Sequence, residues 1–338
     1  MTFAAALEKL LVGQTLTIDE MANQIGAIVD GEILPDQIAA FLVALRNKGE
    51  GIGELVGAAR AMRVRALPVR TPAGIWIDTC GTGGDGKSTL NVSTLAALVV
   101  ATGGGKVAKH GNRASSSQSG SADLLEALGV DVSMPVDRVE RSMAELGIGF
   151  LFAPFFHAAT QKVAAVRRQL GGRTIFNLLG PLTNPAGVRR QLVGVFDPSW
   201  LTSMAEALER LGSERVMVVH GEGGYDEFAP EGATDVVELR DEQISRRKLS
   251  PSDFGLSETV VDGLLGGAPN ENAERAKAIL CGAPGAGRNC VVMTAAATFH
   301  LIEDCSLKDG ASRAKAILDR GVALNLVNRL GEISRGLP

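Results

Sequence analysis

The sequence predicts an α/β protein, with a small N-terminal helical domain followed by a larger α/β domain around a mostly parallel central sheet. Apolar residues recur at helical spacing through the first 65 residues, and from Ile75 onward strand-like runs alternate with helical ones. The 338 residues include 41 Gly but only 11 Phe, 2 Trp and 1 Tyr, which favours an Ala/Gly-rich α/β enzyme. We expect domains at 1–70 and 71–338, with the helical segment 158–182 joining the first.

The helical domain has three apolar stripes and one clear helix start. Thr17 and Glu20 form a capping-box pattern ahead of the first stripe. The stripes comprise Met21, Ile25, Ile28 and Val29, then Ile38, Phe41, Leu42 and Leu45, then Ile52, Leu55, Ala59 and Met62. Such stripes must pack against each other or against a second copy of the chain. The prolines in the segment 67–72 predict a hinge that leads out of this domain.

The α/β domain is predicted from the order of its apolar runs. We expect strands at 74–77, 106–108, 148–152, 191–196, 216–220 and 236–239. We expect helices at 95–102, 121–128, 138–146, 158–170, 200–211, 272–280, 289–299 and 312–320. In such open sheets ligands bind at the carboxyl ends of the strands, so the loops that follow the strands are the candidates for function.

Composition excludes several classes of protein. The net charge of −4 and pI near 5.7 give no general affinity for nucleic acid or anionic membranes. The N-terminus carries charges where a signal peptide would be apolar, and no run approaches the roughly 18 apolar residues of a membrane span. Cys80, Cys281, Cys290 and Cys305 show neither zinc spacing nor a disulfide framework. We expect a soluble, cytoplasmic protein with reduced cysteines.

The stretch 78–94 is typical of a phosphate-binding loop. Its glycines let backbone N–H groups turn inward, its hydroxyls add donors, and the helix that follows supplies a positive dipole end. Residues 81–88 also satisfy the P-loop pattern G-x-x-x-x-G-K-[ST], with 192–197 as a possible Walker B strand. Pro198 directly after that strand argues against an NTPase. This stretch alone does not show which phosphorylated ligand it binds.

A second polar cluster, 109–121, follows the next expected strand. It contains five serines and two glycines together with Lys109 and Arg113. Because it also lies at a strand's carboxyl end, we interpret it as a second anion-binding loop. We call 78–94 the first cradle and 109–121 the second cradle. Two cradles suit a substrate that has two separate phosphate groups.

Asp226 and Glu227 are adjacent carboxylates on a loop that follows the expected strand 216–220. Such hard oxygen ligands suit Mg²⁺ held through carboxylate, water and substrate phosphate. No residue resembles a covalent nucleophile with its base, so we expect direct displacement supported by positioning and charge.

Five segments in this order resemble the anthranilate phosphoribosyltransferase family. They are Gly81–Asp85, Asn91–Thr94, Lys109–Arg113, Arg173–Pro185 and Asp226–Glu227. The resemblance extends over the whole chain. It implies a homodimer formed through the helical part, which transfers phosphoribose from 5-phosphoribosyl 1-pyrophosphate (PRPP) to anthranilate with Mg²⁺.

The resemblance also implies roles for individual residues. Those matched to PRPP binding are Gly81, Gly84, Asp85, Thr89, Asn91, Val92, Ser93, Thr94, Lys109, Ser117 and Ser121. Those matched to anthranilate are Gly81, Asn112 and Arg167, and Ser93 would be a third metal ligand beside Asp226 and Glu227. Lys109 would neutralise the leaving pyrophosphate, and His110 would orient the amine or take its proton. An arginine suits the acceptor because its planar fork binds a carboxylate bidentately.

The chain departs from the family in places. Phe156–Ala159 occupies the position of a common His-His-Pro-Ala series, and Ala165 stands where a proline is frequent. The role of His157 and the wall of the acceptor site therefore stay open. A pyrimidine nucleoside phosphorylase is disfavoured because its Lys-His-Ser-Thr-Gly-Gly segment is absent. A nucleic-acid-binding relative is disfavoured by the acidic composition.

Overall fold

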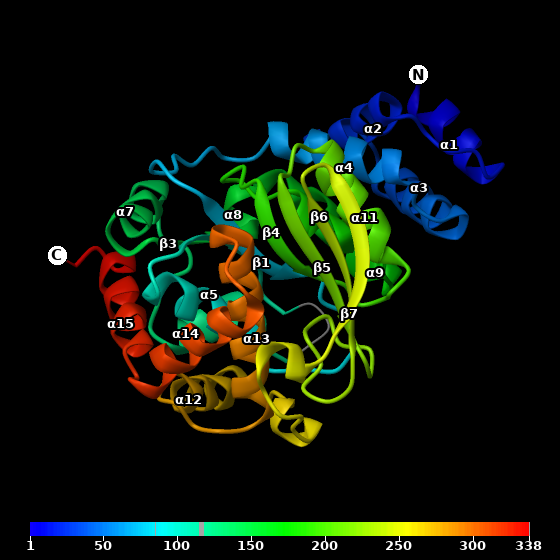
Figure 1. The fold of residues 1–338 in the computed structure, drawn as a ribbon. Coiled ribbons are helices and arrows are strands. Elements are labelled where there is room, and N and C mark those ends of the chain that lie inside the picture. The colour runs from blue at the N-terminus through cyan, green and yellow to red at the C-terminus, as the bar shows by residue number, and fades with distance from the viewer. Residues whose placement is uncertain (85, 115–117, 338) are drawn as a thin grey trace.

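The computed structural model, which describes residues 1–84, 86–114 and 118–337, is a seven-stranded sheet between helical layers with a separate helical cluster on one side (Figure 1). The strand order is β3-β2-β1-β4-β5-β6-β7. Neighbours from β3 to β5 are parallel, and β6 and β7 are added antiparallel. The predicted fold class is confirmed. The strands are β1 (Trp76–Gly81), β2 (Lys106–Gly111), β3 (Ile148–Phe152), β4 (Arg190–Gly194), β5 (Arg215–Gly221), β6 (Thr234–Arg240) and β7 (Gln243–Leu249).

The helices fall into three groups along the chain. The first is α1 (Phe3–Leu11), α2 (Ile18–Asp30), α3 (Pro35–Lys48) and α4 (Ile52–Val64). Between the strands lie α5 (Val92–Thr102), α6 (Ser121–Ala127), α7 (Val136–Leu146), α8 (Ala153–Phe156), α9 (Gln161–Leu170), α10 (Phe176–Leu182) and α11 (Trp200–Arg210). The last group is α12 (Pro269–Leu280), α13 (Ala286–Glu303), α14 (Leu307–Asp319) and α15 (Ala323–Ser334), with 3₁₀ turns at Ala158–Thr160, Pro251–Phe254 and Val261–Leu264.

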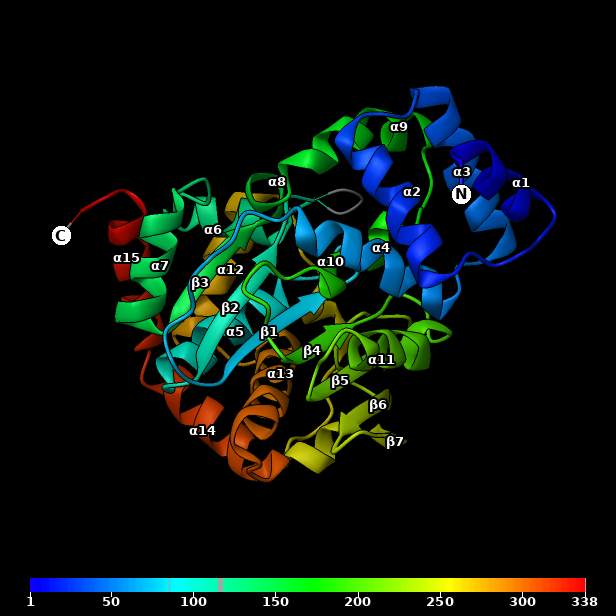
Figure 2. The ribbon, with the colours of Figure 1, turned by 90° about the horizontal axis from the view of Figure 1, so that it is seen from above.

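The helical cluster contains a helix from the middle of the sequence. α9 packs on α2 and α3 (Figure 2), and Lys162 donates a hydrogen bond of 2.7 Å to the Asp30 carbonyl at the end of α2. The predicted capping box is confirmed, since the Thr17 hydroxyl accepts from the Glu20 N–H and the Glu20 carboxylate accepts from the Thr17 N–H. Apolar stripes from these helices form one core that reaches the sheet.

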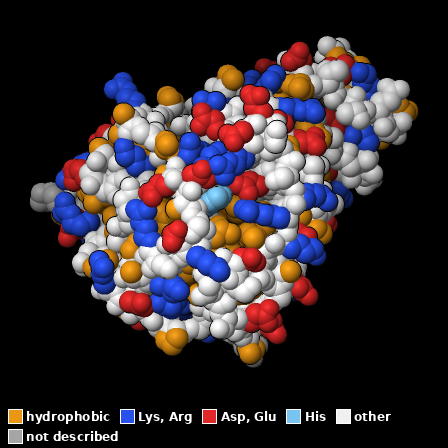
Figure 3. Space-filling view, viewed as in Figure 1, with side chains coloured by type: hydrophobic (Ala, Val, Ile, Leu, Met, Phe, Trp, Pro, Cys, Tyr) orange, Lys and Arg blue, Asp and Glu red, His pale blue; other side chains and the backbone are white. Residues whose placement is uncertain are grey.

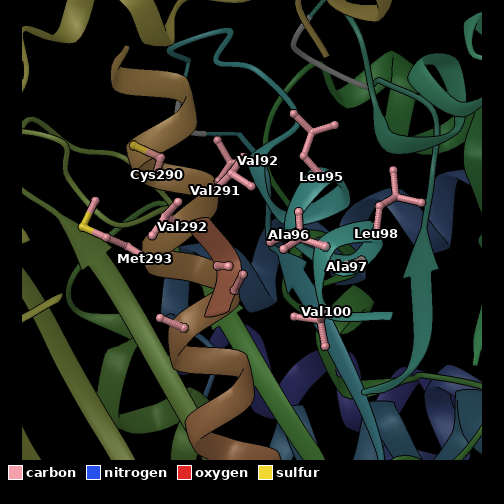
Figure 4. Close-up of a cluster of buried hydrophobic side chains, with 14 of the residues drawn as sticks. Val92, Leu95, Ala96, Ala97, Leu98, Val100, Cys290, Val291, Val292 and Met293 are labelled. Carbon is pink, nitrogen blue, oxygen red and sulfur yellow. The ribbon is translucent and has the colours of Figure 1, made fainter. Parts of the chain in front are cut away.

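The two faces of the sheet belong to different cores because side chains alternate along each strand. Leu192 and Met217 face the core built by α5, α13 and α14, whereas Val193 and Val216 face the core shared with α4 and α11. Figure 4 shows α5 beside α13, with Val, Leu and Ala side chains from one meeting Cys, Val and Met from the other. None of the helices in the described part of the chain is both long and apolar enough to span a bilayer.

Some boundaries differ from the sequence prediction. The first strand was expected at 74–77 but runs from Trp76 to Gly81, because Asp78 and Thr79 are buried with hydrogen-bond partners rather than exposed in a loop. The following helix begins at Val92 instead of Leu95. β7 and α15 were missed. Most β7 side chains are exposed, so it lacks the apolar run used to find strands.

Candidate active site

The site lies where the strand order reverses direction. The chain builds β1, β2 and β3 toward one edge, then returns so that β4 pairs with β1 on its other side. In open α/β sheets the crevice at such a switch point, beyond the carboxyl ends of the strands, is where ligands bind. β1 ends there at Gly81 and β4 at Gly194.

Glycine ends four of the parallel strands, and the structure shows why. A Cβ at Gly81 would lie 2.5 Å from the Asp226 Oδ2, and one at Gly194 would lie 1.6 Å from the Asp226 carbonyl oxygen. A Cβ at Gly221 would lie 2.5 Å from the Glu227 carbonyl, and one at Gly111 would lie 2.3 Å from the Ser121 Oγ. The loop that carries Asp226 and Glu227, here called the acidic turn, and the second cradle therefore rest directly on the strand ends, in space that a side chain would fill.

The acidic turn is hydrogen-bonded to the first cradle. The Gly83 N–H donates to the Asp226 Oδ2 at 2.9 Å, and the Ser93 N–H donates to the Glu227 Oε1 at 3.1 Å. Ser93 lies in the first turn of α5, where the helix dipole favours a negative charge. The structure thus brings together the predicted metal set of Ser93, Asp226 and Glu227.

Lys109 crosses from β2 to this group. Its ammonium donates to the Thr79 carbonyl, and its Nζ lies 3.4 Å from the Ser93 Oγ. The side chain is buried, and burial lowers the pKa of Lys109, while Asp78, Cys80 and Glu227 act in the opposite direction. A buried cation between two strand ends is placed to meet an anion.

Asp78 supports the second strand from inside the sheet. Its carboxylate accepts from the His110 N–H at 3.1 Å and from the Asn184 Nδ2 at 2.8 Å. Burial raises the pKa of Asp78, and the charge of Lys109 and these hydrogen bonds oppose the shift. Sequence reasoning missed Asp78 as a positioning group. The signal was a carboxylate directly after an apolar run, with an asparagine in the 173–185 motif.

His110 is held as a neutral imidazole. Its Nδ1 is 3.0 Å from the Gly180 carbonyl, which can only accept, so Nδ1 carries the proton and Nε2 keeps a lone pair. Burial, with a smaller contribution from His157, lowers the pKa of His110 to about 3. Nε2 is buried and has no hydrogen-bond partner among the residues that the structure describes. His157, whose ring centre is 5.3 Å away, is fixed by the Thr183 carbonyl at 2.8 Å from its Nε2.

The two cradles are tied to each other. The Asn91 Nδ2 donates to the Ser119 carbonyl at 2.9 Å. At the second cradle, the Asn112 N–H donates to the Ser121 Oγ at 3.1 Å, and the Asn112 side chain is exposed. Arg113, which we expected to contribute to the second cradle, bonds Asp123 and Glu126 on α6. Its charge is thus paired with the protein's own carboxylates.

Arg167 extends from α9 across to α10. Its guanidinium lies 5.4 Å from the centre of the Phe176 ring, and partial burial lowers its pKa. Within residues 1–84, 86–114 and 118–337, no carboxylate forms an ion pair with Arg167. Its neighbour Arg168 is exposed. α10 thus contacts both residues, Arg167 through the Phe176 ring and His110 through the Gly180 carbonyl.

Other predicted residues contribute through the backbone. Val92 is buried in the core, and Thr94 is also buried, with a hydroxyl that has no hydrogen-bond partner among the described residues. Thr89 pairs with Leu265 in an isolated β-bridge. The carbonyl of Gly84 accepts from the Arg173 guanidinium, a contact that the sequence did not predict. Asp85 and Ser117 lie outside the described residues.

The acidic turn has the ligand chemistry that Mg²⁺ prefers. It presents adjacent carboxylates from Asp226 and Glu227 beside the Ser93 hydroxyl, all of them hard oxygen donors. Among the described residues there is no cluster of three or more His, Cys, Asp or Glu side chains that could enclose a metal. This set therefore suits a cation that completes its shell with water and substrate phosphate, which is typical of Mg²⁺.

The P-loop alternative disagrees with the local geometry. In a P-loop the Gly-Lys-Ser end of the pattern leads directly into a helix. Here Ser88 has φ +50°, and α5 begins at Val92. The glycine-rich segment instead forms a loop that continues past the pattern before the helix starts.

Comparison with known proteins agrees with this geometry. Residues 4–66 match the model of the glycosyl transferase family's helical bundle domain, and residues 73–324 match its a/b domain. Anthranilate phosphoribosyltransferase of Azorhizobium caulinodans is 46% identical, with 99% of this chain and 97% of that protein covered.

Solved structures give the same result. The crystal structure of anthranilate phosphoribosyltransferase from Thermus thermophilus is 48% identical, with a TM-score of 0.92 over 98% of this chain and 99% of that one. The Saccharomyces cerevisiae enzyme in complex with PRPP and Mg is 29% identical, with a TM-score of 0.89 over 99% and 98%. The yeast enzyme is also known in complex with 4-fluoroanthranilate. The chain belongs to the anthranilate phosphoribosyltransferase family.

Proposed function

We propose that this chain transfers the phosphoribosyl group of PRPP to the amine of anthranilate, giving N-(5-phosphoribosyl)anthranilate and pyrophosphate, a step of tryptophan biosynthesis. The observation that carries the proposal is the acidic turn, whose Asp226 and Glu227 are hydrogen-bonded to Gly83 and Ser93 of the phosphate cradle. A metal-binding pair fixed on a phosphate loop is what a pyrophosphate substrate requires.

The donor side of the site would hold PRPP by backbone N–H groups, hydroxyls and one buried cation. Lys109 sits at the junction of the first cradle and the acidic turn, and Asn91 links both cradles. The yeast relative was solved with PRPP and Mg, which supports Mg²⁺ as the cofactor of this chain as well. When bound, Mg²⁺ would supply positive charge to the pyrophosphate, held by Ser93, Asp226 and Glu227.

The acceptor side would hold anthranilate along α10. Arg167, which has no carboxylate partner in the described chain, would bind the substrate carboxylate, and the apolar ring of Phe176 lies beside it. The buried Nε2 of His110, which has no partner among the described residues, keeps a lone pair that would accept an amine N–H of the acceptor. Asn112 and the Gly81 backbone would complete this side.

The reaction would be a direct displacement. The amine nitrogen forms a bond to the anomeric carbon as the bond from that carbon to pyrophosphate breaks, and the amine then releases one proton to water. Lys109 stabilises the leaving group electrostatically. The low pKa of His110 makes it a weak base, so we assign it the task of orienting the amine.

The test is to mix the protein with anthranilate, PRPP and Mg²⁺ and to follow the loss of anthranilate fluorescence. Consumption that stops when the metal is chelated and resumes when Mg²⁺ is added back is the expected result. Pyrophosphate should appear in equal amount. If no anthranilate is consumed while PRPP binds with Mg²⁺, the acceptor is a different amine, and if PRPP does not bind the proposal is wrong.

We further propose a homodimer formed through the helical part, consisting of residues 1–70 with the joining segment 158–182. Leu11, Val12 and Leu34 on this part are between 62% and 68% exposed. Large apolar side chains that are exposed in the single chain favour burial by a partner. Light scattering should give twice the chain mass, and Leu34→Lys should shift it toward the monomer.

The four free thiols fit a reducing compartment such as the cytoplasm.

A further inference from the structure

The first cradle is fastened from its outer side by a second segment, residues 264–267, here called the strap. The Leu90 N–H donates to the Leu264 carbonyl at 2.9 Å, and the Gly266 N–H donates to the Ser88 carbonyl at 2.7 Å. A Cβ at Gly266 would lie 2.9 Å from that same carbonyl, so the strap can approach this closely only with a glycine there. The strap therefore holds the part of the cradle that leads into α5.

Asn272, in the first half of α12, connects the strap to the cradle. It is 1% exposed. Its Oδ1 accepts from the Gly267 N–H at 2.7 Å, and its Nδ2 lies 3.4 Å from the Asn91 Oδ1. One buried amide thus contacts the end of the strap and the residue that precedes α5.

The backbone partners fix the orientation of both amides. Gly267 offers an N–H, so the Asn272 atom facing it must be the oxygen, and its NH₂ group then faces Asn91. Ser119 offers a carbonyl, so the Asn91 atom facing it must be the nitrogen, and its oxygen then faces Asn272. Donor meets acceptor in the only arrangement that these neighbours allow.

We propose that Asn272 is a positioning residue for PRPP binding, acting through the side chain of Asn91. It connects the strap and both cradles in one chain of hydrogen bonds, from Gly267 through Asn272 and Asn91 to Ser119. The cradle needs this support because Ser88 has φ +50°, a conformation that costs energy for a residue other than glycine. This inference rests on the proposed function, in which the cradle binds PRPP.

Asn272→Ala should raise the KM for PRPP about tenfold, because a buried hydrogen-bond partner of Asn91 is removed, and should leave the KM for anthranilate unchanged. Asn272→Asp keeps the acceptor for Gly267 but turns the donor into an acceptor that faces the Asn91 oxygen. It should raise the KM for PRPP at least as much. The matched control is Asn289→Ala, which removes an amide bonded to Ser257 and Thr259 at the other end of the same loop. It should change neither KM.

A double variant separates positioning from general support. If Asn272 acts through Asn91, then Asn272→Ala should add little to the KM for PRPP once Asn91→Ala is present. Additive effects, an unchanged KM for PRPP, or equal rises in both KM values would overturn the proposal. If Asn272→Ala does not fold, the same comparison is made with Asn272→Asp.

Calorimetric binding of PRPP with Mg²⁺ to the wild type and the variants measures the same effect without turnover. A wild type that binds PRPP but does not consume anthranilate contradicts the proposed function. The tenfold weakening of PRPP binding in Asn272→Ala is still expected in that case, and its absence contradicts the role of Asn272. The two failures are therefore distinguishable.

Discussion

The two ends of the parallel strands use charge in opposite ways. At their amino ends Arg190 and Arg215 stand side by side on β4 and β5, next to Arg240, which ends the antiparallel strand β6 at the same edge of the sheet. Asp304 bonds the last two at 3.0 and 2.7 Å, and it is about half exposed. Hydrogen bonds from Arg240 and Arg215 lower the pKa of Asp304. Each of these arginines therefore has a carboxylate partner within the protein, Glu214 for Arg190 and Asp304 for the other two, although the Nε atoms of Arg190 and Arg215 are buried without a hydrogen-bond partner in the described residues.

At the carboxyl ends the charged groups are buried and less completely paired. Burial lowers the pKa of Lys109 and raises that of Asp78, so each environment works against the charged form. Arg167 has no carboxylate partner in the described chain, and the His110 Nε2 has no partner of any kind there. A protein retains such costly groups where a ligand completes their interactions.

Charge by itself therefore does not identify the site. On the face shown in Figure 3, basic side chains are interspersed with acidic ones, as at the amino ends of the strands. What distinguishes the carboxyl ends is that Lys109 and Arg167 form no ion pair with a carboxylate among the described residues, whereas the arginines at the opposite ends do. If this difference is functional, substitutions there should change catalysis strongly, and substitutions of paired charges at the amino ends should not.

The largest effect is expected for Lys109→Met, which removes the buried cation and keeps most of its length. We expect kcat/KM to fall about 10³-fold, the cost of losing one preorganised group that stabilises charge in the transition state. Steady-state assays with PRPP as the varied substrate measure this fall.

The control is Lys106→Met on the same strand, whose ammonium bonds the Ala73 carbonyl near the amino end. It should change kcat/KM less than twofold. Comparable losses of kcat/KM in both variants would mean that a lysine at the carboxyl end of the strand is no more important for catalysis than one at the amino end.

Arg167→Met should come next. A charged hydrogen bond to a carboxylate is worth about 1.5–3 kcal/mol, so the KM for anthranilate should rise between about 10-fold and 150-fold while the KM for PRPP stays close to its original value. Arg168→Met, on the exposed neighbouring position of α9, is the matched control. A larger rise in the KM for anthranilate in Arg168→Met would show that Arg168, and not Arg167, binds the acceptor carboxylate.

A smaller effect, on the pH dependence of the unfolding free energy, is expected for His110. Its pKa of about 3 lies below the ordinary value of 6.5, so between these values the unfolded state binds more protons and stability falls as the pH decreases. At pH 5 the cost is about 2 kcal/mol. His110→Gln should reduce the loss of unfolding free energy between pH 7.5 and pH 5 by about this amount, measured by urea denaturation. Equal pH dependence in both proteins would show that His110 titrates normally.

Much of this fold could be predicted because apolar spacing reports directly on packing. The capping box at Thr17 and the alternation of strands and helices needed only local information. β1 was placed too early because Asp78 and Thr79 are polar. Their burial depends on partners such as Asn184, which is 106 residues distant. Contacts of that range leave no periodic signal.

The candidate site also has features that sequence motifs indicate and features that depend on contacts between distant residues. Motifs indicated the two cradles and the acidic turn, and the structure brings these segments together. Sequence could not show that Arg113 is bound by carboxylates of α6, because that pairing depends on how the loop folds back. Nor could it show that Asn272 faces Asn91. Both facts depend on the direction of side chains in the folded protein.

The smallest effect is expected at the amino ends. Asp304→Asn removes the charge, keeps an acceptor, and suits the left-handed backbone conformation at φ +61°. Because the charge lies at the surface, we expect a small decrease in Tm that disappears in 1 M NaCl, and no change in kcat or either KM. The pKa of Asp304 is lowered from 3.8, so its contribution to stability is present above that pH and is lost as the pH falls through the folded value. Wild type and variant should therefore converge in stability in acid. A change of more than twofold in kcat/KM would show that the amino ends of the strands are coupled to the reaction. Pairing with a carboxylate would then not distinguish charged groups that support the fold from those that act in catalysis.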